Sequence, residues 1–155
     1  MGAENGLLQS FLAVTGLALG AGLFELRVII PQWAGKRTGK EIAEAMEKSG
    51  HAISGKRFWA LVGPLVLPLT AVNLVAALRS SGARRRWWLG SSATMAGISV
   101  ATATYYVPTL HKLQEVGAIP DAEVEAVAKQ RVQLDYVRVV VGVAAWFAGL
   151  RALSK

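Results

Sequence analysis

The fold is decided by residues 6–33, which read GLLQSFLAVTGLALGAGLFELRVIIPQW and carry charge only at Glu25 and Arg27. No Asp, Glu, Lys or Arg occurs in 5–24, in 58–78 or in 87–110. Each run has at least 20 residues, the helix length that crosses a hydrocarbon core of about 30 Å at about 1.5 Å per residue. A fourth apolar stretch, 137–153, is interrupted only by Arg138 and Arg151. The pattern predicts four transmembrane helices, at about 6–30, 57–78, 87–107 and 132–153.

The composition supports a membrane protein. Of the 155 residues, 53% are hydrophobic and 17% are charged, and the mean hydropathy is positive, whereas soluble domains carry about 25% charge. A soluble helical bundle is disfavoured because no 3.6-residue period confines the apolar residues to one helix face. A cleaved signal peptide is disfavoured because Glu4 is the only charge before the first run. We expect one domain, 1–155, in a multi-pass integral membrane protein, located in the cell membrane if the source is bacterial.

The connecting segments refine this expectation. Pro31 and Pro108 are expected to end the first and third helices, because proline is poorly tolerated inside a helix. Residues 38–48 read as a short amphipathic helix lying on the membrane surface. A long last helix is expected to begin at Asp121 in water and to enter the membrane near Tyr136. The predicted fold class is therefore all-α: a membrane four-helix bundle with a short amphipathic helix in the first loop and an extended fourth helix.

Several function classes find no support in the sequence. There is no cysteine, which excludes disulfides and thiolate metal ligands. The two histidines, His51 and His111, lack the tight spacing of a metal site, and no phosphate-binding loop or dinucleotide fingerprint is present. The net charge is +7, but the basic run ARRRWW (83–88) abuts a span and is typical of anchoring to lipid headgroups rather than of nucleic-acid binding. We expect no metal and no cofactor.

Alternating helix direction places many of the polar residues near one membrane face. Glu25 is expected to face the bundle interior and to pair with Arg138, whereas Arg27 is expected to extend toward the headgroups. Asp135 can pair with Arg131 and Arg138 on its own helix, at spacings of four and three residues. Two interpretations stay open: a buried clamp that locks the first span to the fourth, or the lining of a pocket. The remaining members of the set are Arg57, Tyr105, Tyr106, His111 and Tyr136.

The chain also resembles a known family. The segments GAGLFELRVIIPQWA (20–34), RFWALVGPL (57–65), RRWWL (85–89), YYVPTLHKL (105–113) and RVQLDYVR (131–138) are similar, in order and spacing, to small four-span membrane proteins of the anthrone oxygenase-like family. The chain departs from the family at Val132 and Asp135, where tryptophan and asparagine are expected. An ionised Asp135 would change the charge of the pocket.

The resemblance implies oxidation of a flat aromatic carbon acid by molecular oxygen without a metal or flavin. Glu25 would be the catalytic base, with Asp135 second, and Arg138 or Tyr105 would stabilise the oxyanion. The substrate-binding set would comprise Arg57, Tyr105, Tyr106, His111 and Tyr136.

Three functions stay open: a non-catalytic module that binds a lipophilic small molecule or a lipid, the oxygenase, and a small oligomeric transporter or channel. The expected partners are the lipid bilayer, a lipophilic aromatic molecule and further copies of the chain, with no nucleic acid.

Overall fold

The computed structural model describes residues 2–155, except for the side chains of residues 52–55, and within 2–155 it contains helices and no strand. The longer helices are α1 (Gly2–Phe24), α3 (His51–Arg79), α4 (Gly82–Ala101) and α6 (Asp121–Leu153). Two shorter helices are α2 (Gly39–Lys48) and α5 (Val107–Gln114). Three short segments extend their neighbours: the π-helical turns η1 (Glu25–Ile29) and η3 (Thr102–Tyr106), and the 3₁₀ turn η2 (Ile30–Gln32).

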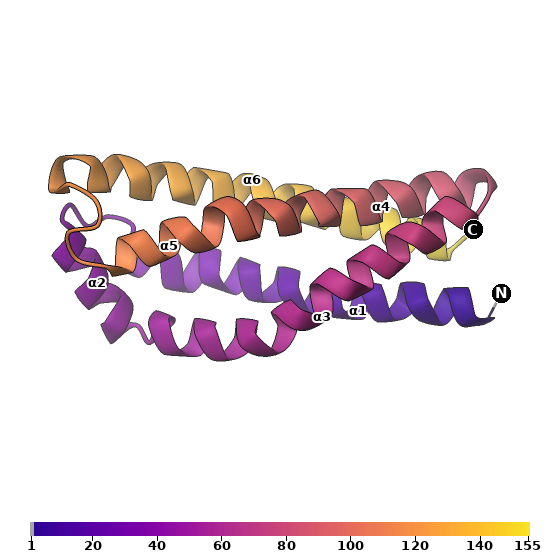
Figure 1. Cartoon of the computed structure of the whole chain (residues 1–155), viewed down its shortest axis with the longest axis horizontal. Helices are drawn as coiled ribbons and strands as arrows, with labels where there is room; N and C mark the ends of the chain where they lie inside the picture. Colours follow the sequence, from indigo (N-terminus) through magenta and orange to yellow (C-terminus); the bar gives the residue numbers. More distant parts are fainter. Residues whose placement is uncertain (1) are drawn as a thin grey trace.

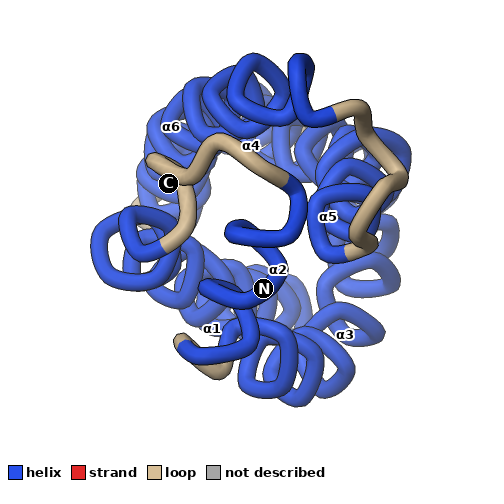
Figure 2. Tube along the Cα trace, turned by 90° about the vertical axis from the view of Figure 1, so that its left-hand side faces the viewer, coloured by secondary structure: helices blue, strands red, loops and turns tan. Residues whose placement is uncertain are grey.

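The long helices lie side by side along one axis, and both termini are at the same end of the molecule (Figure 1). α6 packs against α4 and α1, and α3 packs against the same two helices, which closes a ring around a common interior (Figure 2). α2 lies at the opposite end from the termini. Three helical segments of the described chain are long and apolar enough to cross a membrane: Gly2–Gln32, Lys56–Arg79 and Asp121–Leu153. The predicted third span, 87–107, is helical but is not among them.

The two π-helical turns occur at matching places in the sequence. η1 begins six residues before Pro31, in ELRVIIP, and η3 begins six residues before Pro108, in TATYYVP. In both, the residue before the proline donates its N–H to the carbonyl five residues back, Ile30 to Glu25 and Val107 to Thr102. A proline has no N–H to donate, and its ring clashes with the carbonyl four residues back, so a wider turn relieves this conflict without ending the helix.

The prediction that Pro108 ends the third helix is therefore wrong. The chain passes through η3 and continues as α5 to Gln114, with Pro108 in the first turn of α5. Pro64 and Pro68 lie inside α3, which bends about midway along its length (Figure 1). The expected extent of the last helix is confirmed, because α6 runs without a break from Asp121 to Leu153.

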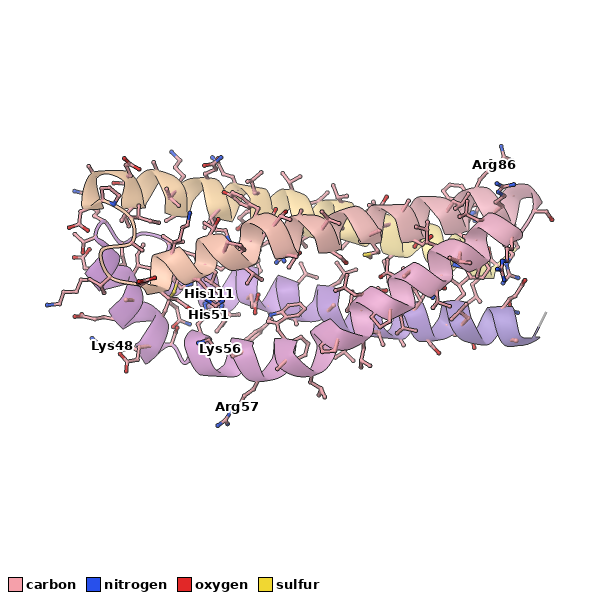
Figure 3. The ribbon with its side chains drawn as sticks, in the orientation of Figure 1. Lys48, His51, Lys56, Arg57, Arg86 and His111 are labelled. Atoms are coloured by element: carbon pink, nitrogen blue, oxygen red, sulfur yellow. The ribbon has the colours of Figure 1, made fainter. Side chains whose placement is uncertain are left out.

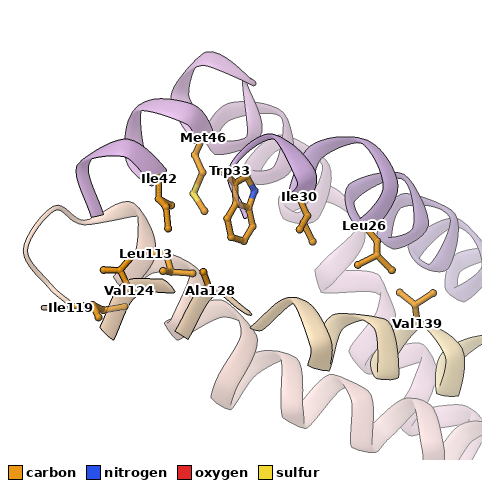
Figure 4. Packing of buried hydrophobic residues seen from close by; sticks show 10 residues of the cluster. All are labelled: Leu26, Ile30, Trp33, Ile42, Met46, Leu113, Ile119, Val124, Ala128 and Val139. Atoms are coloured by element: carbon orange, nitrogen blue, oxygen red, sulfur yellow. The ribbon is translucent and has the colours of Figure 1, made fainter. Parts of the chain in front are cut away.

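The short helix α2 closes one end of the molecule. Thr38 caps it by accepting the Glu41 N–H at 3.3 Å, and the Glu41 carboxylate accepts the N–H groups of Arg37 and Thr38, which also lowers the pKa of Glu41. Ile42 and Met46 are buried against other parts of the protein. They belong to a cluster formed with α5, α6 and the residues that follow α1, 26–33 (Figure 4). The apolar face that we expected to meet the membrane surface is thus covered by the protein itself.

A second buried cluster, centred on Leu8, Phe11 and Trp88, occupies the end that holds the termini. Here α6 approaches its neighbours closely because it presents glycine. A Cβ at Gly142 would lie 2.5 Å from the nearest Leu19 methyl, and one at Gly149 would lie 2.6 Å from a Leu12 methyl. The basic run 83–88 lies at this same end, where Figure 3 shows Arg86 far from Lys48 of α2. The interior between the two clusters holds the polar residues described next.

Candidate functional site

Three charged side chains of α6 form a compact buried group. Asp135 is only 1% exposed and lies between Arg131, four residues before it, and Arg138, three residues after it. Both arginines form ion pairs with it, and Arg138 Nη2 lies 2.9 Å from Asp135 Oδ1. The local pairing expected from the spacing is confirmed. Two guanidiniums share one carboxylate.

Tyr106 lies beneath both guanidiniums. The carbon centres of the Arg131 and Arg138 guanidiniums lie 4.6 and 4.7 Å from the centroid of its ring, within the range of cation–π attraction. Its hydroxyl donates to the Leu134 carbonyl at 2.7 Å, and Tyr105 packs edge-on against the ring at 5.3 Å. Tyr106 ends the wide turn η3, so the turn and its proline set the position of the ring.

Glu25 has a different partner from the one expected. Its Oε1 accepts the indole N–H of Trp59 from α3 at 2.9 Å, and no ion pair in the described part of the chain joins it to Arg138. Arg138 instead pairs with Asp135, which helix geometry places next to it. The predicted direct ion pair between Glu25 and Arg138 does not form, although the Glu25 carboxylate still attracts Arg138 electrostatically. Arg27 is exposed, as expected.

The other predicted residues separate into two groups. Tyr105 and Tyr106 lie beside the charged group of α6. Arg57 and His111 are exposed, and Arg57 points away from the helices in Figure 3. Tyr136 is 45% exposed, on a different side of α6 from its buried neighbour Asp135. These three side chains do not join the cluster, because their positions on the helices turn them outward.

A cavity of about 240 Å³ lies among the long helices, beside the charged group. Its walls are almost entirely apolar, and Arg138 is the only charged side chain among them. The Trp59 indole, which binds Glu25, forms another part of the wall. Two of the lining residues, Leu67 of α3 and Val107 of α5, are 57% and 45% exposed, which places the opening between these two helices. The remaining lining residues are Thr15, Ala18, Leu19, Gly22, Gly63, Val66, Met95, Ile98, Ser99, Thr102, Ala103 and Val139.

His51 and Trp33 form a second buried polar contact near α2. The Trp33 indole N–H donates to His51 Nδ1 at 3.2 Å. The two rings are stacked, with their centroids 6.2 Å apart. His51 Nδ1 must therefore be unprotonated, which requires the neutral ring. Burial lowers the pKa of His51, opposed by the negative charge of Glu25 and assisted by the positive charge of Arg131. His51 contributes an interior hydrogen bond, and no group of three potential metal ligands is found among the described residues.

This geometry predicts a stability that depends on pH. Because the His51 pKa is lowered in the folded state, the unfolded chain binds more protons below its ordinary pKa of about 6.5, so stability falls as the pH drops through that value. We expect a loss of about 1 kcal/mol between pH 8 and pH 5.5, the net value of one buried hydrogen bond. Thermal unfolding in detergent measures it. The exposed His111→Asn should keep the pH dependence, whereas His51→Asn, which retains an acceptor, should reduce it. An equal slope in the two variants would contradict the assignment.

Two site residues escaped the sequence analysis. Trp59 and Trp33 occur in the segments RFWALVGPL and PQWA, yet neither was selected. The available signal was chemical: an indole N–H inside an apolar segment needs an acceptor, and Glu25 and His51 are polar residues close to such segments.

No family model, no curated protein and no solved structure matches this chain.

Proposed function

We propose that the chain is a multi-pass integral membrane protein that binds a lipophilic small molecule in the cavity between its helices. Membrane insertion is supported by the outward side chains. Large apolar residues on the candidate spans are strongly exposed, and only 22–28% of the most apolar window of each span is buried. In water such a surface would be a liability for a soluble protein; in lipid it is the expected exterior. The most exposed examples are Leu17, Leu61, Val140 and Phe147.

We infer that the α4–η3–α5 segment crosses the membrane as well, giving a four-helix bundle. It is less apolar than the other three because of its serines and threonines. Several of these hydroxyls donate to their own helix: Ser92 to Trp88, Ser99 to Met95 and Thr102 to Ile98, at 2.7–2.9 Å. Such bonds reduce the cost of placing hydroxyls in lipid. Contacts with α3 and α6 on either side further shield the segment.

The cavity is the observation that carries the ligand-binding proposal. Its volume of about 240 Å³ lies just below the usual range of about 300–1,000 Å³ for small-molecule sites, which favours a compact ligand such as a two- or three-ring aromatic compound. Its walls are apolar with one convergent charged group, the usual composition of a small-molecule site. An opening between α3 and α5 would face the hydrocarbon of the bilayer, so a lipophilic ligand could enter without crossing water.

The ion pairs favour a pocket over a clamp. A charge near the centre of a membrane costs about 2.5–3.5 kcal/mol on insertion scales, so its presence calls for a role. Both ion pairs lie within α6 and join no other helix to it. They therefore cannot lock the first span to the fourth, whereas Arg138 does form part of the cavity wall.

Filling the cavity should abolish binding. Gly63 lines it, and a Cβ built at this position meets no atom within 4 Å, so Gly63→Leu would project into the empty space. We expect at least a tenfold loss of affinity for a neutral aromatic probe, 2-acetylnaphthalene, measured by equilibrium dialysis against protein in phosphatidylcholine nanodiscs. Gly20→Leu is the matched control, because Gly20 is exposed, has equal room and does not line the cavity. Equal loss in both variants, or no binding to the wild type, would contradict the proposal.

The anthrone oxygenase alternative has weaker support. It would need a base that reaches a substrate proton, but Glu25 does not line the cavity and one of its oxygens is held by Trp59. Asp135 is enclosed by two arginines. We therefore propose binding ahead of catalysis.

A further inference from the structure

The polar atoms on the cavity wall differ in what they can offer a ligand. The hydroxyls of Thr15, Ser99 and Thr102 donate to carbonyls four residues earlier on their own helices, so their protons are already used. The Trp59 indole N–H is used by Glu25. The guanidinium of Arg138 is the only other polar side-chain group among the lining residues.

Arg138 has hydrogen-bond capacity to spare. A guanidinium carries five N–H donors. The described direct contacts of Arg138 are the ion pair through Nη2 to Asp135 and the stacking on Tyr106, and the Glu25 carboxylate attracts it without forming an ion pair. Its neighbour Arg131 is 93% buried and its Nε has no hydrogen-bond partner in the described chain. One carboxylate thus serves two guanidiniums that together hold ten donors, and the group has more donors than acceptors.

The nearby carboxylates do not offset this excess of hydrogen-bond donors at the cavity wall. Neither Asp135 nor Glu25 lines it. Asp135 lies between the two arginines, and Glu25 Oε1 accepts from Trp59. A ligand in the cavity therefore meets N–H donors at its polar end and no carboxylate.

We propose that the cavity selects lipophilic molecules whose polar group is an oxygen acceptor, a carbonyl or a carboxylate, placed against Arg138. This proposal rests on the proposed ligand-binding function and adds the chemistry of the ligand. An acceptor oxygen gains charge-assisted hydrogen bonds in a low-dielectric setting, which are stronger than neutral ones. An ammonium group would instead face a guanidinium of like charge.

The test compares naphthalenes of one size that differ in one group: 2-acetylnaphthalene, 2-naphthoate and 2-(aminomethyl)naphthalene, at pH 7.5 in phosphatidylcholine nanodiscs. Empty nanodiscs correct for partitioning into lipid. We expect the better of the two acceptor compounds to bind at least tenfold more tightly than the amine. Tighter binding of the naphthoate would identify the ligand class as a carboxylic acid, and tighter binding of the ketone would identify it as a neutral carbonyl compound. An amine that binds as tightly as both would overturn the proposal.

Arg138→Met separates this interaction from packing. Methionine replaces the charged side chain with an unbranched apolar one, and Asp135 stays paired with Arg131, so the fold should persist. We expect its preference for acceptors over the amine to disappear, whereas Arg131→Met, whose site does not line the cavity, should retain it. A preference that survives in Arg138→Met would overturn the proposal. If Arg138→Met does not fold, the order in which the wild-type protein binds the three naphthalenes still tests the proposal. Failure of the proposed function itself would look different: no compound would bind better to the wild type than to Gly63→Leu.

Discussion

Replacing Asp135 with asparagine should lower the free energy of unfolding by about 3–5 kcal/mol, the cost of removing one partner from a buried ion pair. Asp135 is 1% exposed and is the shared counter-charge of Arg131 and Arg138. Asparagine has nearly the same shape but no charge, so two guanidiniums would be left close together without a carboxylate between them. Reversible unfolding in mixed detergent micelles measures the change.

Two comparisons test this explanation. Glu125→Gln removes an exposed charge from the same helix and should have little effect. The triple change of Asp135→Leu with Arg131→Met and Arg138→Met removes the whole charged group, and it should recover most of the lost stability, since well-packed apolar side chains can replace a buried ion pair. A triple variant as unstable as Asp135→Asn would mean that the shape of Asp135, rather than its charge, holds this region together.

The sequence predicted best those features that depend on neighbours along the chain. Two of the three apolar helices coincide with the charge-free runs 5–24 and 58–78, and the third contains the apolar stretch 137–153. The spacing of Arg131, Asp135 and Arg138 on one helix was enough to predict their pairing. The partner of Glu25 depended on the rotation of one helix relative to another, which the sequence does not specify. A depth argument selected Arg138, whereas the structure supplies an indole from α3.

The cavity was beyond sequence reasoning for a similar reason. Small residues on different helices line it, among them Gly22 of α1 and Gly63 of α3, and larger side chains there would take up part of the space. The wide turns that precede two of the prolines were also missed. The first helical segment does end close to Pro31, at Gln32, whereas the segment that contains Pro108 continues as α5 to Gln114. The repeated six-residue spacing could have suggested a common device, although not its geometry.

Truncating Trp33 should have the second large effect, for a reason unrelated to charge. Its side chain is fully buried between α2 and the ends of the long helices, in the cluster with Ile42, Met46 and Leu113 (Figure 4). Removing a buried tryptophan typically costs about 3–5 kcal/mol, so Trp33→Ala should destabilise the protein by that amount. Because α2 is held mainly by this cluster, we also expect faster trypsin cleavage at the lysines of residues 36–48.

Two variants distinguish the contribution of the Trp33 ring from that of its hydrogen bond. Trp33→Phe keeps an aromatic ring but loses the donor to His51, so it should cost less than Trp33→Ala and should weaken the dependence of stability on pH. Trp87→Ala removes the same side chain from a position that is 44% exposed, and its effect should be much smaller. If Trp87→Ala proved as costly as Trp33→Ala, burial could not be the cause. If trypsin cleaved the 36–48 segment at the wild-type rate in Trp33→Ala, α2 would have to be held by other contacts, the hydrogen bond from Gly39 N–H to Asp121 being the first to examine.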